Sequence, residues 1–241
     1  MSIIKQTVHS LFGAVGLKVE RLPKKGFVPT AKQYFNTGEL SPLQENSLEL
    51  YDAFYGDDKA LEEYYIPNGY RLKFYETVVN FLKERNVDLN NKTIIDVGCG
   101  IGFLLSNIQK TYNTKKLSGS DFSQNAVDFS AKKFPNIEFF QQDLNDPIPG
   151  MYDVIFCTEV LEHLEKPYVA ISNMLAALNE KGSLILTVPN GRTDNLIEHI
   201  NFWSPESWKV YLERECTGCD VKTQLMPIVN NTINFALITK R

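Results

Sequence analysis

The stretch from Thr93 to Leu105 constrains the fold of this chain more than any other feature of its sequence. Residues 93–97 are a short, mostly β-branched apolar run, which is typical of a strand covered on both faces. Three glycines follow at alternate positions, Gly98, Gly100 and Gly102, and apolar residues then recur at helical spacing. Glycines allow positive φ and a close ligand approach, and the next helix offers unpaired N–H groups. The stretch therefore predicts a strand, a ligand-binding loop and a helix.

The spacing of these glycines indicates which ligand the loop binds. Dinucleotide-binding dehydrogenases carry G-x-G-x-x-G, whereas the third glycine here comes one residue earlier and Asp96 stands two positions before the first. A carboxylate beside the loop repels a pyrophosphate but suits an ammonium or sulfonium charge. In this form the loop resembles the first motif, D-x-G-x-G-x-G, of the class I S-adenosylmethionine-dependent methyltransferases. The resemblance implies that S-adenosylmethionine is the cofactor, bound by Asp96, Gly98, Gly100 and Gly102.

A second acidic residue, Asp121, stands nineteen residues beyond Gly102, at the end of the next expected strand. A carboxylate at this place can accept hydrogen bonds from both ribose hydroxyls, as it does in dinucleotide-binding folds. Phe122 is placed to lie against the adenine ring. We also expect Arg71, at the start of a helix, to meet the cofactor carboxylate, although an arginine in such a position is commonly solvated instead.

The end of the third expected strand supplies a further acid, Asp143. The resemblance implies that an acid at this place binds the adenine amino group, and the alternative is a turn residue before a proline. Leu144 and Thr158, after the third and at the end of the fourth expected strand, complete the expected cofactor contacts.

The alternation of strands and helices predicts an α/β fold with a Rossmann-like, doubly wound, seven-stranded sheet. The expected strands span residues 93–97, 116–121, 137–140, 152–158, 183–188, 221–225 and 233–239. No helix separates the last two strands, so we expect them to form an antiparallel terminal hairpin. We assign residues 69–241 to a methyltransferase domain and residues 1–68 to an N-terminal helical extension.

The N-terminal extension differs from the rest of the chain in charge. Residues 1–33 hold six basic residues and one acidic residue, a net +5, which leaves −9 for the remainder of a chain with formal net charge −4. Apolar residues predict an amphipathic helix over residues 3–15, which either packs on protein or contacts a membrane surface or a polyanion. Residues 40–65 are rich in aromatic rings. They predict two short helices, which form either a lid over the cofactor or simply core.

The segment Glu159, Glu162 and His163 carries the candidate chemistry at the end of the fourth strand. If the chain turns helical there, the three side chains share one face, and His199 can join them from a neighbouring loop. The segment resembles the E-x-x-E-H segment of the ubiquinone-biosynthesis O-methyltransferases, which implies a divalent metal such as Mg²⁺ or Zn²⁺ beside the acceptor. Related methyltransferases carry the segment without a metal. In that alternative His163, or else His199, is the general base.

These motifs favour an S-adenosylmethionine-dependent O-methyltransferase acting on a small-molecule or glycan hydroxyl. The alternatives are an RNA 2′-O-methyltransferase, disfavoured by the net acidity, a non-catalytic scaffold with a methyltransferase fold, and, least favoured, a nicotinamide oxidoreductase. No apolar run reaches the roughly 18 residues that span a bilayer and no signal peptide opens the chain, so we expect a cytoplasmic protein. Its four cysteines do not indicate a disulfide framework.

Overall fold

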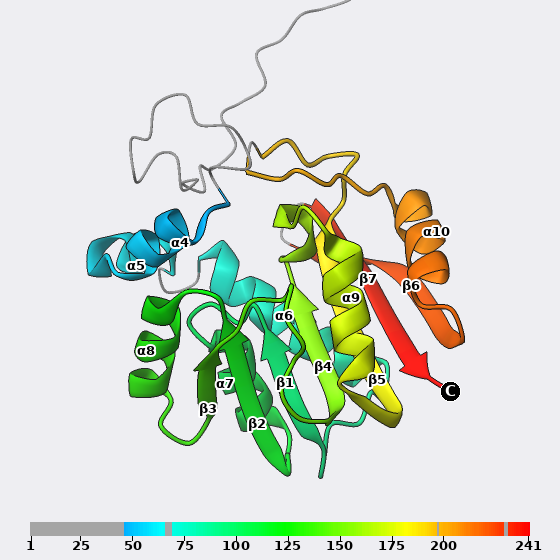
Figure 1. Cartoon of the computed structure of the whole chain (residues 1–241), viewed down its shortest axis with the longest axis horizontal. Coiled ribbons are helices and arrows are strands. Elements are labelled where there is room, and N and C mark those ends of the chain that lie inside the picture. Colours follow the sequence, from blue (N-terminus) through cyan, green and yellow to red (C-terminus); the bar gives the residue numbers. More distant parts are fainter. Residues whose placement is uncertain (1–45, 66–68, 197, 229–230) are drawn as a thin grey trace, which may run out of the picture.

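The computed structural model describes residues 46–65, 69–196, 198–228 and 231–241 (Figure 1). Seven strands form one sheet in the order β3-β2-β1-β4-β5-β7-β6. The strands are β1 (Thr93–Val97), β2 (Lys116–Asp121), β3 (Glu138–Gln141), β4 (Tyr152–Thr158), β5 (Leu178–Pro189), β6 (Cys219–Ile228) and β7 (Asn231–Lys240). The helices are α4 (Leu48–Tyr55), α5 (Asp58–Tyr64), α6 (Tyr70–Glu84), α7 (Phe103–Thr111), α8 (Gln124–Lys133), α9 (Pro167–Ala176) and α10 (Pro205–Glu215), with a 3-10 turn over Leu161–His163.

The pairing of the strands confirms the predicted Rossmann-like sheet with its terminal hairpin. Strands β1 to β5 pair in parallel, and β7 runs antiparallel between β5 and β6. Parallel pairing brings the carboxyl ends of β1, β2, β4 and β5 to one edge of the sheet. This edge is where open α/β sheets bind their ligands.

Alternate residues of each central strand pack into two cores, one on each face of the sheet. Ile94 packs with the face covered by α6 and α7, whereas Ile95 packs with the face covered by α9 and α10. Figure 1 shows α9 in front of the sheet and α6 behind it. Side chains on a strand point alternately to opposite faces, so an apolar run without polar interruption suits a strand that is buried on both sides.

Some boundaries differ from the prediction. Strand β5 begins at Leu178 rather than at residue 183, because Leu178 already pairs with Tyr152 before a register shift in β4. The expected turn after α9 therefore lies inside the strand. The predicted helix over residues 3–15 and the basic segment 1–33 lie outside the described residues. The division of the chain at residue 68 stays a prediction.

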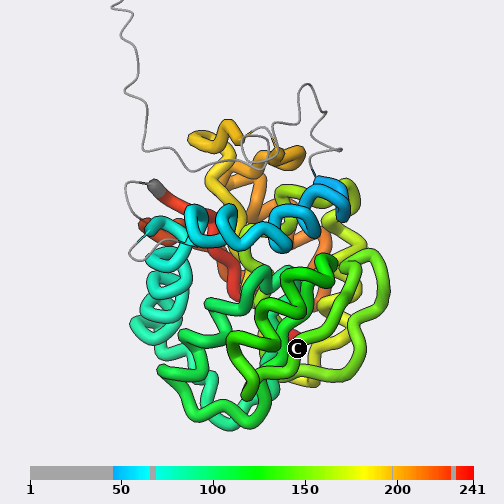
Figure 2. The backbone as a smooth tube through the Cα atoms, turned by 90° about the vertical axis from the view of Figure 1, so that its left-hand side faces the viewer, coloured from blue at the N-terminus to red at the C-terminus, as the bar shows by residue number. Residues whose placement is uncertain are grey.

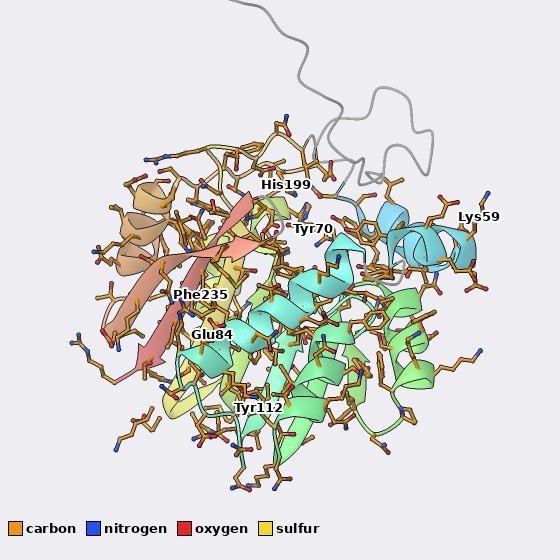
Figure 3. All side chains as sticks on the ribbon, turned by 180° about the vertical axis from the view of Figure 1, so that it is seen from behind. Lys59, Tyr70, Glu84, Tyr112, His199 and Phe235 are labelled. Atoms are coloured by element: carbon orange, nitrogen blue, oxygen red, sulfur yellow. The ribbon has the colours of Figure 1, made fainter. Side chains whose placement is uncertain are left out.

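The two helices predicted from the aromatic segment, α4 and α5, are present. Figure 2 shows them, in blue, lying across one end of the molecule, above the carboxyl ends of the strands. Helix α6 crosses the back of the sheet, with Tyr70 at its upper end and Glu84 at its lower end in Figure 3. None of the helices in the described part of the chain is long and apolar enough to cross a membrane.

Candidate active site

A cavity opens at the carboxyl edge of the sheet, with about 1260 Å³ of empty space including the part open to solvent. Its walls come from three parts of the chain: the loops after β1, β2 and β3, the helices α4 to α6, and the segments after β4 and β5. Aromatic rings and a few convergent polar groups line it, which is the usual make-up of a small-molecule site.

The glycine loop forms one wall of the cavity. Its backbone conformation favours glycine over residues with a side chain at three positions. Gly98, Gly100 and Gly102 have φ of 70°, 52° and 76°, the left-handed region that favours glycine. A Cβ on Gly100 would lie 3.0 Å from the Tyr55 hydroxyl, so a side chain there would meet the helices that cover the loop. Gly98 and Gly100 line the cavity, whereas Gly102 serves as the N-cap of α7.

Asp121 lies at the end of β2 and faces the cavity, as predicted for a ribose-binding carboxylate. Its two oxygens accept hydrogen bonds from the backbone N–H groups of Gly100, at 2.8 Å, and Ser123, at 3.0 Å. Burial raises its pKa to about 6, and these backbone hydrogen bonds hold the pKa down against that effect. The carboxylate thus fixes the glycine loop while keeping acceptor capacity for a ligand.

The structure sorts the other expected cofactor residues into two groups. The members that line the cavity are Arg71, Phe122, Asp143, Leu144 and Thr158. Asp143 also accepts two hydrogen bonds from Asn145, so the turn role weighed for it is present as well. Asp96 is buried beneath the loop and is not among the residues lining the cavity, and its burial raises its pKa well above the usual range. The expected direct contact of Asp96 with a charged ligand therefore lacks support from its position.

Helices α4 and α5 cover the cofactor side of the cavity, and their rings serve both as cover and as core. Tyr51, Phe54, Tyr55 and Tyr64 line the cavity, and the same segment packs as a small cluster against Ile101. The core alternative is therefore confirmed for part of this segment, and the lid over the cofactor stays a prediction.

Asp52 fastens this cover to α8 and was not anticipated. It accepts hydrogen bonds from the Ser123 hydroxyl, at 2.6 Å, and from the Asn125 backbone, at 3.0 Å. An acid in an aromatic-rich helix gives no signal in the sequence for a contact with α8.

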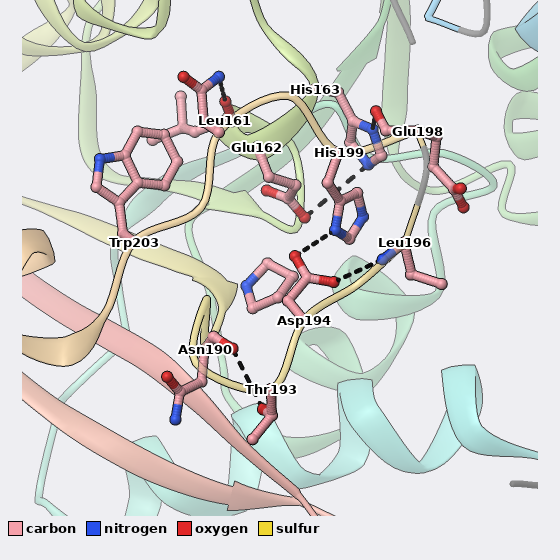
Figure 4. Close-up of polar contacts among 12 residues, drawn as sticks. Leu161, Glu162, His163, Asn190, Thr193, Asp194, Leu196, Glu198, His199 and Trp203 are labelled. Atoms are coloured by element: carbon pink, nitrogen blue, oxygen red, sulfur yellow. Dashed lines mark hydrogen bonds and ion pairs between the residues drawn. The ribbon is translucent and has the colours of Figure 1, made fainter. Parts of the chain in front are cut away.

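Three of the four predicted metal or catalytic residues converge beside the opposite side of the cavity, where His163 and His199 line it and Glu162 is buried next to them. Glu162, His163 and His199 each offer one ligand atom, and these atoms lie within 4.8 Å of one another. The rings of His163 and His199 meet edge to face at 4.7 Å (Figure 4). Burial, with repulsion from His199, lowers the pKa of His163 to about 3, so this ring is neutral at physiological pH.

Glu162 is a buried carboxyl group without hydrogen-bond partners for either side-chain oxygen among the described residues. The His163 Nε2 atom is 3.9 Å from Glu162 Oε1, too far for a hydrogen bond. Burial and the nearby Glu159 raise the pKa of Glu162 well above its usual range. A buried polar group with no partner is costly in a folded protein, so it points to a function at this place.

The expected helical arrangement of Glu159 with Glu162 and His163 is wrong. Glu159 has φ of 55°, a strained conformation for a residue other than glycine, and only a 3-10 turn over residues 161–163 follows it. Its carboxylate accepts a hydrogen bond from the Thr187 hydroxyl at 3.1 Å. Glu159 lines the cavity but does not join the cluster of possible metal ligands.

Comparison with known proteins identifies the class to which this fold and site belong. Residues 68–215 match the model of the methyltransferase-domain family, and the chain belongs to this family. Its fold resembles that of magnesium protoporphyrin IX methyltransferase from Synechocystis PCC 6803, solved with bound S-adenosylmethionine, with a TM-score of 0.56 and 18% identity over 100% of this chain and 99% of the other. The resemblance to class I S-adenosylmethionine-dependent methyltransferases is confirmed.

The matches to curated relatives cover a smaller part of the chain. The chain is 26% identical over 130 residues to a malonyl-[acyl-carrier protein] O-methyltransferase of Halalkalibacterium halodurans, a match that covers 50% of this chain and 48% of that protein. It is 30% identical over 115 residues to the mitochondrial ubiquinone biosynthesis O-methyltransferase of Saccharomyces cerevisiae, covering 44% of this chain and 37% of that protein. The chain thus spans half or less of the length of these relatives.

Proposed function

We propose that this protein transfers a methyl group from S-adenosylmethionine to a hydroxyl oxygen of a small molecule or glycan. One observation carries the proposal: a single cavity is lined by the glycine loop and Asp121 on one side and by His163 and His199 on the other. The buried Glu162 carboxyl group lies within 4.8 Å of ring nitrogens of both histidines. Two of the relatives described above are named as O-methyltransferases, which supports an oxygen acceptor.

In this proposal the cofactor lies along the glycine loop. Asp121 accepts hydrogen bonds from the ribose and Phe122 lies against the adenine, with Asp143 and Leu144 nearby. The guanidinium of Arg71 meets the amino-acid carboxylate, since its Nε atom is buried and has no hydrogen-bond partner in the described residues. This placement directs the methyl group towards the cluster formed by Glu162 and the two histidines.

The chain's own task in methyl transfer is to align the acceptor oxygen with the methyl carbon, exclude water and remove the hydroxyl proton. His163 is neutral and buried, which suits a proton acceptor. His199 lies beside it and is the second candidate for this role.

The same residues also fit a divalent metal such as Mg²⁺ or Zn²⁺. The two unpartnered oxygens of Glu162 and the imidazoles of His163 and His199 are a donor set that such ions accept. Held by these residues, such an ion would supply a Lewis acid that lowers the pKa of an acceptor hydroxyl. Glu159, which is held by Thr187, is not needed as a ligand in this arrangement.

Two measurements test the proposal. Calorimetry with S-adenosylmethionine and its demethylated product tests the cofactor, and a screen with radiolabelled methyl donor against phenols, diols and glycans tests the acceptor. Tight binding of NADH, or cofactor binding without transfer to any acceptor class, would contradict the enzyme proposed. If only RNA were methylated, the proposed small-molecule or glycan acceptor would be wrong and RNA would be the acceptor.

The metal is tested separately by elemental analysis and by activity before and after chelation, with each ion added back. Restoration by one ion supports the metal. Full activity in a verified metal-free preparation would eliminate the metal and leave His163, then His199, as the general base.

A further inference from the structure

His199 makes a short contact to a residue that the sequence did not suggest. Its Nδ1 atom lies 2.6 Å from Oδ2 of Asp194, and each side chain is only 5% exposed (Figure 4). Among the described residues no Lys or Arg pairs with Asp194, and His199 is the side chain that its Oδ2 atom contacts. A hydrogen bond of this length to a buried carboxylate fixes the orientation of the imidazole ring.

The contact also decides which nitrogen of His199 carries hydrogen. An ionised carboxylate only accepts hydrogen bonds, so Nδ1 of His199 must be the donor. In a neutral imidazole with hydrogen on Nδ1, the Nε2 atom holds a lone pair. The atom available for a proton or for a metal ion is therefore Nε2.

His163 follows the same pattern with different partners. Its Nδ1 atom lies 3.0 Å from the side-chain oxygen of Asn46 and 3.2 Å from the backbone oxygen of Glu198. Both oxygens are carbonyl acceptors and lie closer than the Tyr51 hydroxyl, which is 3.4 Å from Nδ1 and can accept or donate. We therefore assign hydrogen to Nδ1 of His163 as well. Both rings thus have Nε2 as the nitrogen without hydrogen, and Nε2 of His163 lies 3.9 Å from an unpartnered oxygen of Glu162.

The loop that carries Asp194 holds the carboxylate in place. The backbone N–H of Asp194 donates to the Asn190 carbonyl at 3.0 Å, and its Oδ1 accepts from the Leu196 backbone at 3.3 Å. The Asn190 side chain is tied in turn to Thr232 at 3.0 Å. The carboxylate is thus anchored by backbone contacts before it orients the imidazole.

We propose that Asp194 is a positioning residue of the active site, which orients His199 and holds it in the tautomer with hydrogen on Nδ1. The proposal rests on the function proposed above, because it assigns His199 Nε2 to the reaction or to the metal. A residue of this kind acts through the histidine and does not touch the acceptor. Partners of this kind are worth about 10- to 100-fold in metal affinity or activity.

The tautomer can be measured directly in the full-length protein. The chain has three histidines, His9, His163 and His199, so ¹⁵N-labelled imidazoles give few, separable signals. His9→Gln and His199→Gln variants assign them. At a pH where the rings are neutral, we expect hydrogen on Nδ1 of both His163 and His199. In Asp194→Asn we expect His199 to shift towards hydrogen on Nε2, because the amide can donate to Nδ1, while His163 stays unchanged.

Kinetics then link the tautomer to the reaction. Asp194→Asn should lower methyl transfer about 10- to 100-fold. The same substitution in a His199→Gln background should add little, because the residues act as a unit. Asp220→Asn, an exposed acid on β6, is the matched control and should keep wild-type activity.

The outcomes separate this inference from the proposed function. A wild-type His199 with hydrogen on Nε2, an unchanged tautomer in Asp194→Asn, or full additivity of the two substitutions would overturn the inference. Unchanged cofactor affinity in Asp194→Asn shows that the variant is folded. Failure of every acceptor assay would contradict the proposed function, while the tautomer measurement would still decide the role of Asp194.

Discussion

The two sides of the cavity are built in different ways. The cofactor side uses backbone: a glycine loop and one carboxylate, drawn from residues 98 to 121 and held by short hydrogen bonds. The side that we propose for the acceptor uses side chains from segments far apart in the chain, Asn46, His163 and His199, and the buried Glu162 beside it keeps carboxyl oxygens without partners among the described residues. A loop whose backbone groups are already hydrogen-bonded is a rigid surface that suits one constant ligand, such as a cofactor. Buried polar side chains without hydrogen-bond partners are typical of groups that take part in a reaction.

The largest expected effect tests whether the two sides are separable. Glu162→Gln keeps the shape of a buried group but replaces the carboxyl by an amide that cannot ionise, so it can neither exchange a proton nor bind a cation as a carboxylate, and methyl transfer should fall about 100-fold or more. Calorimetry should give wild-type affinity for S-adenosylmethionine. A parallel loss of cofactor affinity would show that the two sides are one unit.

Asp121→Ala tests the cofactor side alone. It removes the acceptor of two ribose hydroxyls and of two loop N–H groups, so cofactor affinity should fall by about 2–3 kcal/mol, roughly 30- to 150-fold. Calorimetry measures the loss, with Asp220→Ala as the control. Equal affinity in wild type and Asp121→Ala would reject the ribose assignment.

The cover formed by α4 and α5 should show a smaller effect. Asp52→Ala removes the bonds from α4 to Ser123 and Asn125, and the change should cost about 1 kcal/mol in unfolding free energy and raise KM for the acceptor. Asp57→Ala is the matched control, because Asp57 caps α5 through the Lys59 and Ala60 backbone without contacting α8. It should lower stability by a similar amount and leave KM unchanged. The same rise in KM for both variants would contradict a specific role of the α4 contact.

The smallest effect is a pH dependence. Because the pKa of Asp121 is raised to about 6, this group is protonated below that pH and loses acceptor capacity, so cofactor affinity should fall by up to about tenfold between pH 7 and pH 5. The linked effect on stability has the opposite sign. A folded pKa above the unfolded value means that the contribution of Asp121 to stability decreases as pH rises from about 4 through 6. Asp121→Asn should abolish both trends in calorimetry and thermal unfolding.

Residues close together in the sequence were the predictable ones. The path from Thr93 through the glycine loop to Asp121 follows from strand patterning and spacing, and the structure places it as expected. The segment that resembles E-x-x-E-H predicted Glu162 and His163 as neighbours, with His199 joining from a separate loop, and the structure brings these three together without Glu159. These features depend on local rules of strand, turn and helix.

Contacts between distant segments were not predictable. The side-chain partners Asn46, Asp52 and Asp194 belong to ordinary polar stretches, and their roles arise only when α4 and the loop after β5 meet the site. The sequence also did not predict the left-handed conformation of Glu159, because no rule of helix propensity gives φ of 55° at a glutamate. Tertiary packing decides such features.

Ser123 contacts both Asp121, the proposed ribose-binding residue, and helix α4, which covers the cavity. Its backbone N–H donates to Asp121, and its hydroxyl donates to Asp52 of α4. Through this serine, seating of α4 and occupation of the ribose site become thermodynamically linked events. By reciprocity, the factor by which the cofactor favours the seated helix equals the factor by which the seated helix favours the cofactor.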